Sequence, residues 1–223
     1  MNFYVDEIYF YFIYFLLTFA INLDHGKSYE DIMLGINSGF TSIMVDRSSL
    51  SYEDNIAQTK ETVKMCRPLN ISVEAELGHV GQGVDYSSDG SDHFTNPEEA
   101  RKFVEETGID CLAVAIGTAH GRYHGTPHID FDLLKQITDI VDIPLVLHGG
   151  SGTGDENLRK AVKNGIQKVN LATELVVAGK EELETFIQDK NFDKWQLIPS
   201  FIKGYSDRLE HYVKLFDQEN RAW

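Results

Sequence analysis

Six short apolar runs alternate with helix-like segments along this chain, and this alternation limits the possible folds more than any other feature. The runs are almost continuously apolar, as strands are when both faces of a sheet are covered. We expect strands at residues 21–23, 41–45, 71–75, 111–116, 143–147 and 167–171. We expect helices at residues 28–37, 51–67, 97–107, 131–141, 156–164, 174–188 and 199–219. Strand–helix alternation of this kind predicts an α/β fold with a parallel sheet.

Polar residues come at the end of each predicted strand or shortly after it. They are Asp24, His25, Asp46, Glu76, His120, His148 and Asn170. In a (β/α)8 TIM barrel, the carboxyl ends of the strands form the rim on which active sites are built. An open, doubly wound sheet is the alternative, but it needs a glycine-rich phosphate loop after its first strand. Residues 24–28, DHGKS, match such a loop poorly, so the sequence favours the barrel.

Six strands do not close an eight-stranded barrel. At roughly 30 residues for each βα unit, two missing units correspond to about 60 to 80 residues. The two helices predicted after residue 174 are typical of a C-terminal ending, so the first two βα units are the ones expected to be missing. We therefore expect a barrel truncated at its N-terminus, or one completed by a partner chain.

Residues 1–20 form an atypical hydrophobic N-terminal segment, which we separate from a barrel-type domain at residues 21–223. The run from residue 8 to residue 20 is almost wholly apolar, but a membrane-spanning helix needs about 18 or more such residues. No Lys or Arg precedes the run, so a signal peptide is also a poor match. We favour a hydrophobic piece that packs on the barrel, or a segment foreign to the fold, over a membrane anchor.

The net charge of −15 argues against non-specific binding to nucleic acid or to an anionic membrane. It leaves room for a phosphorylated small molecule held locally by backbone N–H groups. The chain has only two cysteines, Cys66 and Cys111, which do not make a disulfide framework. A reducing cytoplasm is the expected compartment.

Three histidines, His25, His120 and His148, follow three different predicted strands, and each precedes a glycine. Three imidazoles that converge on one barrel rim, with a further position open, are typical of catalytic zinc. A single histidine at such a place is more often a structural residue or a proton carrier, but three on one rim favour a metal. The remaining five histidines, His79, His93, His124, His128 and His211, are expected in loops or at the surface.

The stretch from Gly149 to Gly152 follows His148 directly and contains three glycines and Ser151. Glycines let the backbone turn sharply and bring N–H groups close to a ligand. A helix pattern begins near Asp155, and the N-terminus of a helix attracts anions. The stretch therefore predicts a phosphate cradle, with a tight strand-to-helix turn as the alternative.

Five motifs, LDHGKS, VEAELG, AVAIGTAHG, VLHGGSG and VNLATEL, occur in this order between residues 21 and 180. In this respect the chain resembles the class II, zinc-dependent ketose-bisphosphate aldolases, which include fructose-bisphosphate and tagatose-bisphosphate aldolases. The fold of that family is a (β/α)8 barrel, and the resemblance implies that residues 21–223 hold strands three to eight and the C-terminal helices. It also implies a homo-oligomer, either a dimer or a tetramer.

The resemblance implies a role for each matching residue. His25, His120 and His148 match the zinc ligands, Glu76 matches a further ligand or a group behind the ligands, and Asp24 matches the proton donor. The positions that match the site for dihydroxyacetone phosphate are Gly121, Gly149, Gly150, Ser151, Asn170, Leu171, Ala172 and Thr173. One catalytic Zn²⁺ is implied, with a monovalent cation as a possible addition. The implied reaction cleaves fructose-1,6-bisphosphate or tagatose-1,6-bisphosphate to dihydroxyacetone phosphate and glyceraldehyde 3-phosphate.

Three of these roles have structural alternatives. Asp24 is also suited to capping a helix or to supporting a histidine ligand, and Thr173 is suited to capping the next helix. Glu74 lies two residues before Glu76 and faces the same side of the strand, so either carboxylate is also a candidate for an ion pair inside the barrel.

The sequence departs from the family pattern at two further places. The loop after AELG lacks the usual acidic run, for which Asp85, Asp89 and Asp92 are the nearest substitutes, and Ala172 stands where fructose-specific members often have aspartate. Two alternatives to an aldolase therefore stay open. One is a non-catalytic remnant that keeps zinc or phosphate binding, and the other is a metal-dependent isomerase or epimerase of sugar phosphates.

Overall fold

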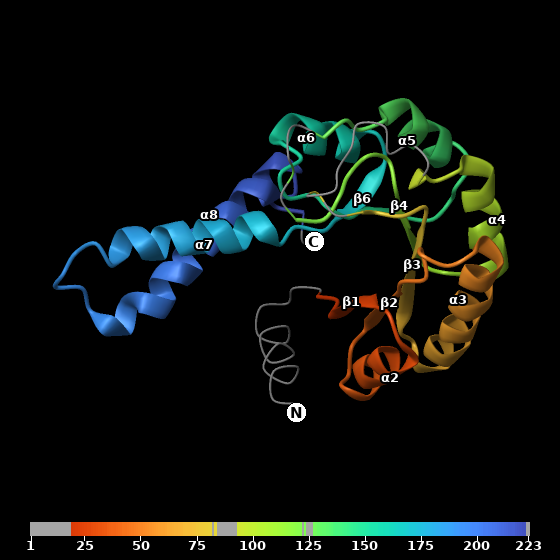
Figure 1. Cartoon of the computed structure of the whole chain (residues 1–223), viewed down its shortest axis with the longest axis horizontal. Coiled ribbons are helices and arrows are strands. Elements are labelled where there is room, and N and C mark those ends of the chain that lie inside the picture. The colour runs from red at the N-terminus through yellow and green to blue at the C-terminus, as the bar shows by residue number, and fades with distance from the viewer. Residues whose placement is uncertain (1–18, 82, 84–92, 122, 124–126, 222–223) are drawn as a thin grey trace.

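The computed structural model describes residues 19–81, 83, 93–121, 123 and 127–221, and in this part of the chain parallel strands alternate with helices (Figure 1). The strands are β1 (Asn22–Gly26), β2 (Ser42–Val45), β3 (Ser72–Leu77), β4 (Cys111–Val114), β5 (Leu145–Leu147) and β6 (Ile166–Val169). All six predicted strands are confirmed, with ends that move by a few residues.

Each predicted helix is also present. The helices are α2 (Tyr29–Asn37), α3 (Tyr52–Cys66), α4 (Pro97–Thr107), α5 (Phe131–Thr138), α6 (Asp155–Lys163), α7 (Thr173–Phe186) and α8 (Leu197–Leu215). Two short 3₁₀ helices, η1 (Arg67–Leu69) and η4 (Lys194–Gln196), extend the end of α3 and precede α8. Figure 1 shows α3, α4, α5 and α6 along the outer side of the sheet, whereas α7 and α8 run together away from it as a two-helix arm.

The strands follow one another in a single six-stranded sheet of order β1-β2-β3-β4-β5-β6, and every neighbouring pair is parallel. Sequential parallel strands with a helix after each are the arrangement of a (β/α) barrel. Within the described residues β1 and β6 are the two edges of the sheet, so the fold is the predicted incomplete (β/α)8 barrel.

The two faces of the sheet have different chemistry because side chains alternate along a strand. On the outer face, residues such as Ile43, Val73 and Leu112 pack with helix residues such as Phe103 and Leu134 in the main hydrophobic core. The inner face carries a smaller apolar cluster of Met44, Ala113 and Val146. Glu74 and Glu76, on the same inner face of β3, are 1% and 0% exposed.

Local sequence signals explain where several helices begin. The Ser28 hydroxyl accepts a hydrogen bond from the Asp31 N–H, and the Asp31 side chain accepts one from the Ser28 N–H, which completes a capping box for α2. Ser51 caps α3 by accepting a hydrogen bond from the Asp54 N–H. These helix starts agree with the sequence and fix the loops that follow β1 and β2.

The predicted hydrophobic segment at residues 1–20 lies, apart from its last two residues, outside the described residues. In the part of the chain that the structure describes, every helix is too short or too polar to cross a bilayer.

Candidate metal and substrate site

Three imidazoles meet at the carboxyl ends of β1, β4 and β5. His25 lies within β1, His148 follows β5 directly, and His120 lies six residues beyond the end of β4. His25 Nε2 is 3.1 Å from His120 Nε2, which is 3.5 Å from His148 Nδ1. One ring nitrogen from each histidine lies within 4.8 Å of those of the other two, so the group has the geometry to hold a metal ion. The structure thus brings together the three histidines that the sequence singled out.

Two carboxylates determine which nitrogen of each outer imidazole carries its proton. Asp46 Oδ2 lies 2.8 Å from His25 Nδ1, and Glu74 Oε1 lies 2.8 Å from His148 Nε2. An ionised carboxylate only accepts hydrogen bonds, so both of these nitrogens carry N–H. The other nitrogens, His25 Nε2 and His148 Nδ1, face His120, and they are the atoms available to a metal ion. Carboxylates placed behind imidazoles in this way are typical of zinc sites, so the donor set fits zinc.

The electrostatics of the cluster favour neutral imidazole at its centre. Burial, together with the neighbouring His25 and His148, lowers the pKa of His120 to about 4. The hydrogen bond with Asp46 raises the pKa of His25. Burial opposes ionisation of Asp46, but hydrogen bonds from His25 and Ser48 outweigh it and hold the Asp46 pKa below its usual range. A neutral His120 has the lone pair that a metal ion requires.

Glu76 is a second carboxylate close to His25. Ligand atoms of His25, Asp46 and Glu76 also lie within 4.8 Å of one another. Glu76 Oε1 accepts a hydrogen bond from the Val80 N–H at 2.9 Å, whereas its buried Oε2 has no hydrogen-bond partner among the described residues. Burial raises the pKa of this carboxyl. A buried oxygen without a partner is costly in free energy, and a cation beside it would remove that cost.

The backbone that carries His25 is held in an uncommon conformation. His25 has φ of 50°, in the left-handed region that few non-glycine residues adopt. The buried Arg47 guanidinium donates to the carbonyls of Gly26 and Asp46 at 2.9 and 2.8 Å, which ties the ends of β1 and β2 together. A Cβ at Gly26 would lie 2.8 Å from the Met44 carbonyl oxygen, which explains the glycine after this histidine.

A cavity of about 320 Å³ opens beside the histidines. Its lining contains all eight residues that the sequence assigned to substrate binding, together with Asp24, two of the histidines and Val169. The lining residues are Asp24, His120, Gly121, His148, Gly149, Gly150, Ser151, Val169, Asn170, Leu171, Ala172 and Thr173. The predicted substrate residues are therefore neighbours in space, at the ends of β4, β5 and β6.

The glycine stretch after β5 differs in detail from a simple phosphate cradle. Gly149 has φ of 68°, and a Cβ there would lie 2.3 Å from the Ala119 carbonyl oxygen, so a side chain is excluded. The Gly150 N–H donates to the Asn170 carbonyl at 3.1 Å and is thereby already engaged. The Ser151 hydroxyl oxygen accepts from the N–H groups of Ala172 and Glu174 at 3.2 and 3.3 Å.

The helix that lines the cavity is not the one that the sequence predicted. The sequence pointed to the helix near Asp155, which is α6, but the cavity is lined by Thr173, the first residue of α7. Ser151 caps α7 from another loop, so Thr173 is not the capping residue that the alternative interpretation suggested. The contact between Ser151 and the start of α7 could not be predicted from local sequence, because α6 and β6 lie between them in the chain.

Asp24 is exposed at the cavity and is oriented by one amide. Its Oδ1 accepts a hydrogen bond from Asn170 Nδ2 at 3.1 Å. The same Nδ2 lies 3.3 Å from both ring nitrogens of His148. Asn170 thus connects Asp24 with the histidine cluster, and the caps of the nearby helices come from other residues.

Sequence reasoning missed three supporting residues. Asp46 was noted as a strand-end residue but not assigned a role, Glu74 was weighed only as an ion-pair partner, and Lys168 was not considered. The signal for Glu74 was its position two residues before Glu76. Lys168 gave no separate signal, because a lone lysine in a strand is usually an exposed residue.

The remaining histidines are outside this cluster where the structure describes them. His79 Nδ1 lies 2.9 Å from the Ser48 hydroxyl, and His211 pairs with Asp155 at 2.9 Å. His124 and the candidate proton-transfer residues Asp85, Asp89 and Asp92 lie outside the described residues.

Comparisons with known proteins agree with this geometry. Residues 16–221 match the protein family described as fructose-bisphosphate aldolase class-II. The crystal structure of the YdjI aldolase from Escherichia coli K12 matches this chain with a TM-score of 0.79 and 38% sequence identity. The match covers 91% of this chain and 70% of the YdjI chain. A Coccidioides immitis protein assigned as a fructose-1,6-biphosphate aldolase is 31% identical, with a TM-score of 0.79, over 92% of this chain and 74% of that one. Fructose-bisphosphate aldolase from Campylobacter jejuni, at 22% identity and a TM-score of 0.69, covers 88% of this chain and 69% of that one and shares the fold.

Proposed function

This chain belongs to the class-II fructose-bisphosphate aldolase family, and we propose that it catalyses zinc-dependent cleavage and formation of a ketose bisphosphate. The proposed substrates are fructose-1,6-bisphosphate and tagatose-1,6-bisphosphate, and the products are dihydroxyacetone phosphate and glyceraldehyde 3-phosphate. The observation that carries the proposal is the cluster of three imidazoles, oriented by carboxylates, beside a cavity lined by glycines.

His25, His120 and His148 would hold the zinc ion, and Glu76 is the proposed further ligand or support. When bound, zinc supplies Lewis-acid polarisation of the ketose carbonyl. Three imidazole ligands leave a fourth position for substrate, which is the usual composition of a catalytic zinc site. Their outer N–H groups keep the rings oriented before the metal arrives, because Asp46 and Glu74 are already in contact with them.

Asp24 is the proposed acid–base group. In cleavage its carboxylate takes the proton of the C4 hydroxyl while the C3–C4 bond breaks and C4 becomes the aldehyde carbon. In condensation the same carboxyl returns that proton to the C4 oxygen. Its exposure at the cavity and its hydrogen bond from Asn170 support this role, because they leave Oδ2 able to reach a substrate hydroxyl.

The phosphate of the dihydroxyacetone half is proposed to lie against Ser151 and the first residues of α7. The Ser151 oxygen already accepts two N–H groups, so its own proton is available to donate to a phosphate oxygen. The positive end of the α7 dipole would favour an anion at this position. Gly121 also lines the cavity, and it leaves open the space that a side chain there would occupy.

The proposed function is tested by incubating the purified chain with each of the two ketose bisphosphates and measuring dihydroxyacetone phosphate. We expect cleavage that a zinc chelator abolishes and added Zn²⁺ restores. Zinc binding without cleavage of either sugar would contradict the aldolase proposal in favour of a non-catalytic remnant. Conversion of a sugar phosphate without C–C cleavage, followed by NMR, would instead favour an isomerase or epimerase.

A homo-oligomer is the proposed assembly, and the arm of α7 and α8 supplies its surface. Gly179 and Gly204 let the two helices pack closely, since a Cβ at Gly204 would lie 2.4 Å from the Ala178 carbonyl oxygen. A stripe of large apolar side chains on η4 and α8 stays exposed. It consists of Trp195, Ile198, Ile202 and Leu209, with exposed fractions of 76, 73, 54 and 44%. Their spacing of three, four and seven residues places them on one face, as in helices that pack against another helix.

The variant Ile198→Glu/Ile202→Glu is expected to lower the oligomeric state, because charges on this stripe oppose apolar burial between copies. Analytical ultracentrifugation or light scattering measures the mass directly. Gln188→Glu, at an exposed position beyond the end of α7, adds a negative charge to the arm at a residue that is not part of the stripe and serves as the control. An unchanged mass of the double variant would contradict this surface as the interface.

Both cysteines are unbridged, and burial raises the pKa of Cys66 to about 11 and that of Cys111 to about 12. The proposed location is cytoplasmic, because two cysteines do not make a disulfide framework and a reducing compartment suits them.

A further inference from the structure

A chain of charged contacts leads away from the histidine cluster through the inside of the sheet. Glu74 Oε1 lies 2.8 Å from His148 Nε2, and Glu74 Oε2 lies 2.8 Å from Lys168 Nζ. The side chains of His148 and Glu74 are each 1% exposed, whereas that of Lys168 is 37% exposed. Glu74 is on β3 and Lys168 is on β6, and these strands are not neighbours in the sheet. The lysine therefore reaches across the concave inner face to meet the carboxylate.

The surroundings of the Glu74–Lys168 ion pair argue against a purely structural role. The nearby inner face is apolar, with Met44, Ala113 and Val146 fully buried. Only the Glu74 end of the pair is buried, and the cost of burying a carboxylate offsets much of what an ion pair contributes, so the pair is weak evidence of a role in stability. Glu74 also forms a hydrogen bond with His148 of the histidine cluster. The pair is thus better explained by what it does to that histidine.

We propose that Lys168 is a positioning residue, which acts through Glu74 to hold His148 in the orientation and tautomer needed for zinc binding. This inference rests on the proposed function. Lys168 occupies Oε2, so the carboxylate presents Oε1 to His148 Nε2–H and the lone pair on Nδ1 points to the cluster. Without the lysine, the buried Oε2 keeps one contact among the described residues, with the Cys111 thiol, a weak donor that lies 3.7 Å away.

The hydrogen-bond geometry agrees with this arrangement. The ammonium group of Lys168 can only donate, so Glu74 Oε2 accepts from Lys168 Nζ at 2.8 Å. The other carboxylate oxygen, Oε1, is then left to accept from His148 Nε2–H at 2.8 Å.

The direction in which zinc affinity changes when the charge of Lys168 is removed distinguishes a positioning role from direct charge repulsion. Lys168 is a cation near a cation site, so direct repulsion predicts that removing its charge strengthens zinc binding. Positioning through Glu74 predicts the opposite, since His148 loses its fixed orientation. Groups behind a metal ligand typically change metal affinity by about 10- to 100-fold.

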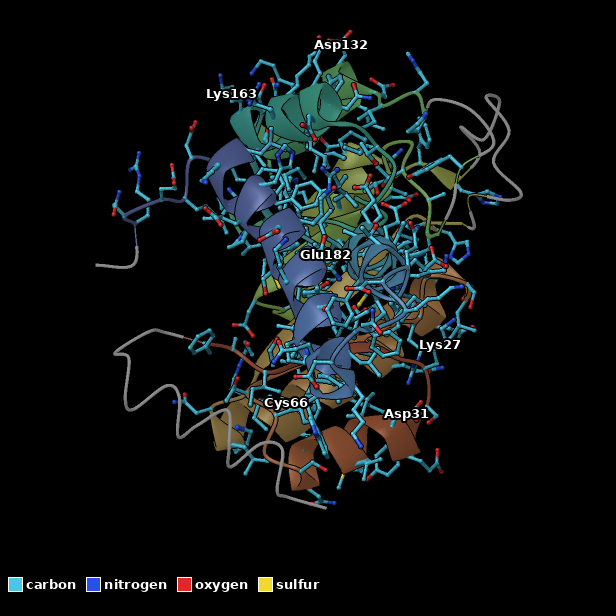
Figure 2. The ribbon with its side chains drawn as sticks, turned by 90° about the vertical axis from the view of Figure 1, so that its left-hand side faces the viewer. Lys27, Asp31, Cys66, Asp132, Lys163 and Glu182 are labelled. Carbon is cyan, nitrogen blue, oxygen red and sulfur yellow. The ribbon has the colours of Figure 1, made fainter. Side chains whose placement is uncertain are left out.

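The first test measures the zinc dissociation constant of the purified chain by competition with a chromophoric chelator. Lys168→Met is expected to weaken zinc binding by about tenfold or more, and Lys168→Arg to stay within about threefold of the wild type. Lys168→Gln is a second neutral variant, for use where the methionine variant folds poorly. Lys163→Met, which removes an exposed lysine of α6 (Figure 2), is the matched control and is expected to bind zinc like the wild type.

The second test asks whether Lys168 acts through Glu74. In a Glu74→Gln background, Lys168→Met is expected to change zinc affinity little, because the intermediate carboxylate has been removed. With Co²⁺ in place of Zn²⁺, the visible spectrum of the Lys168→Met protein is expected to shift, while that of the Lys163→Met protein does not. Far-ultraviolet circular dichroism checks that each variant is folded.

Three results would overturn the inference. In the first, the Lys168→Met protein binds zinc as tightly as the wild type or more tightly. In the second, Lys168→Met lowers zinc affinity by the same factor in the wild-type and the Glu74→Gln backgrounds. In both cases a wild-type chain that binds zinc and cleaves its substrate leaves the proposed function intact. A wild-type chain that binds no zinc would overturn the inference and the proposed function together.

Discussion

The His120→Ala variant is expected to lose its zinc and, with it, the cleavage activity. His120 Nε2 is the common neighbour of His25 and His148, and its removal leaves two imidazoles whose ring centres are 4.7 Å apart. Two imidazoles without the third hold zinc weakly, because catalytic zinc takes three protein ligands in most sites. Bound metal, measured by atomic emission after dialysis, is expected to fall from about one to below about 0.1 zinc per chain.

The fold of this variant is expected to survive, because His120 lies at the rim and contributes no side chain to the main core. His211→Ala is the matched control, since His211 pairs with Asp155 on α6, outside the cluster. It is expected to keep its zinc and its rate. A His120→Ala protein that retains about one zinc per chain would remove this histidine from the ligand set.

Asp24→Asn is expected to lower kcat by about 10²- to 10⁴-fold, the usual contribution of a positioned acid–base group. The amide oxygen of asparagine can still accept the hydrogen bond from Asn170, so the side chain keeps its place and loses only its ability to take a proton. Zinc content and thermal stability are therefore expected to stay at wild-type values. Steady-state kinetics of ketose bisphosphate cleavage measures the effect.

A partial reaction makes the Asp24 test specific. Dihydroxyacetone phosphate has no C4 hydroxyl, so exchange of its C3 proton with D₂O is expected to persist in the Asp24→Asn protein. Asp132→Asn, at an exposed position of α5 (Figure 2), is the control and should cleave the sugar at the wild-type rate. Full-rate cleavage by the Asp24→Asn protein would show that another group moves the C4 proton.

Much of the fold could be predicted from local patterns. Apolar runs gave all six strands, and the side-chain pairs at Ser28 and Ser51 gave the starts of α2 and α3. These signals depend on neighbours within a few residues, so they are visible in one dimension. The rule that active residues follow parallel strands then placed His25, His120 and His148 on one rim.

The parts of the site that the sequence concealed all depend on long-range contacts. Lys168 meets Glu74 across the inner face of the sheet, 94 residues away in the chain. Ser151 caps a helix that begins more than twenty residues later, so the proposed phosphate position lies beside α7 rather than α6. Neither contact follows from periodicity, since each depends on the curvature that brings β3, β5 and β6 together.

X-ray absorption at the zinc edge tests the central claim most directly. The purified chain, loaded with one equivalent of zinc, is expected to show three imidazole nitrogens at about 2.0–2.1 Å and a remaining light-atom ligand. That result would identify the histidine cluster as the zinc site. Sulfur scattering at about 2.3 Å, or a shell with one imidazole or none, would contradict the account, because it would place the metal away from His25, His120 and His148.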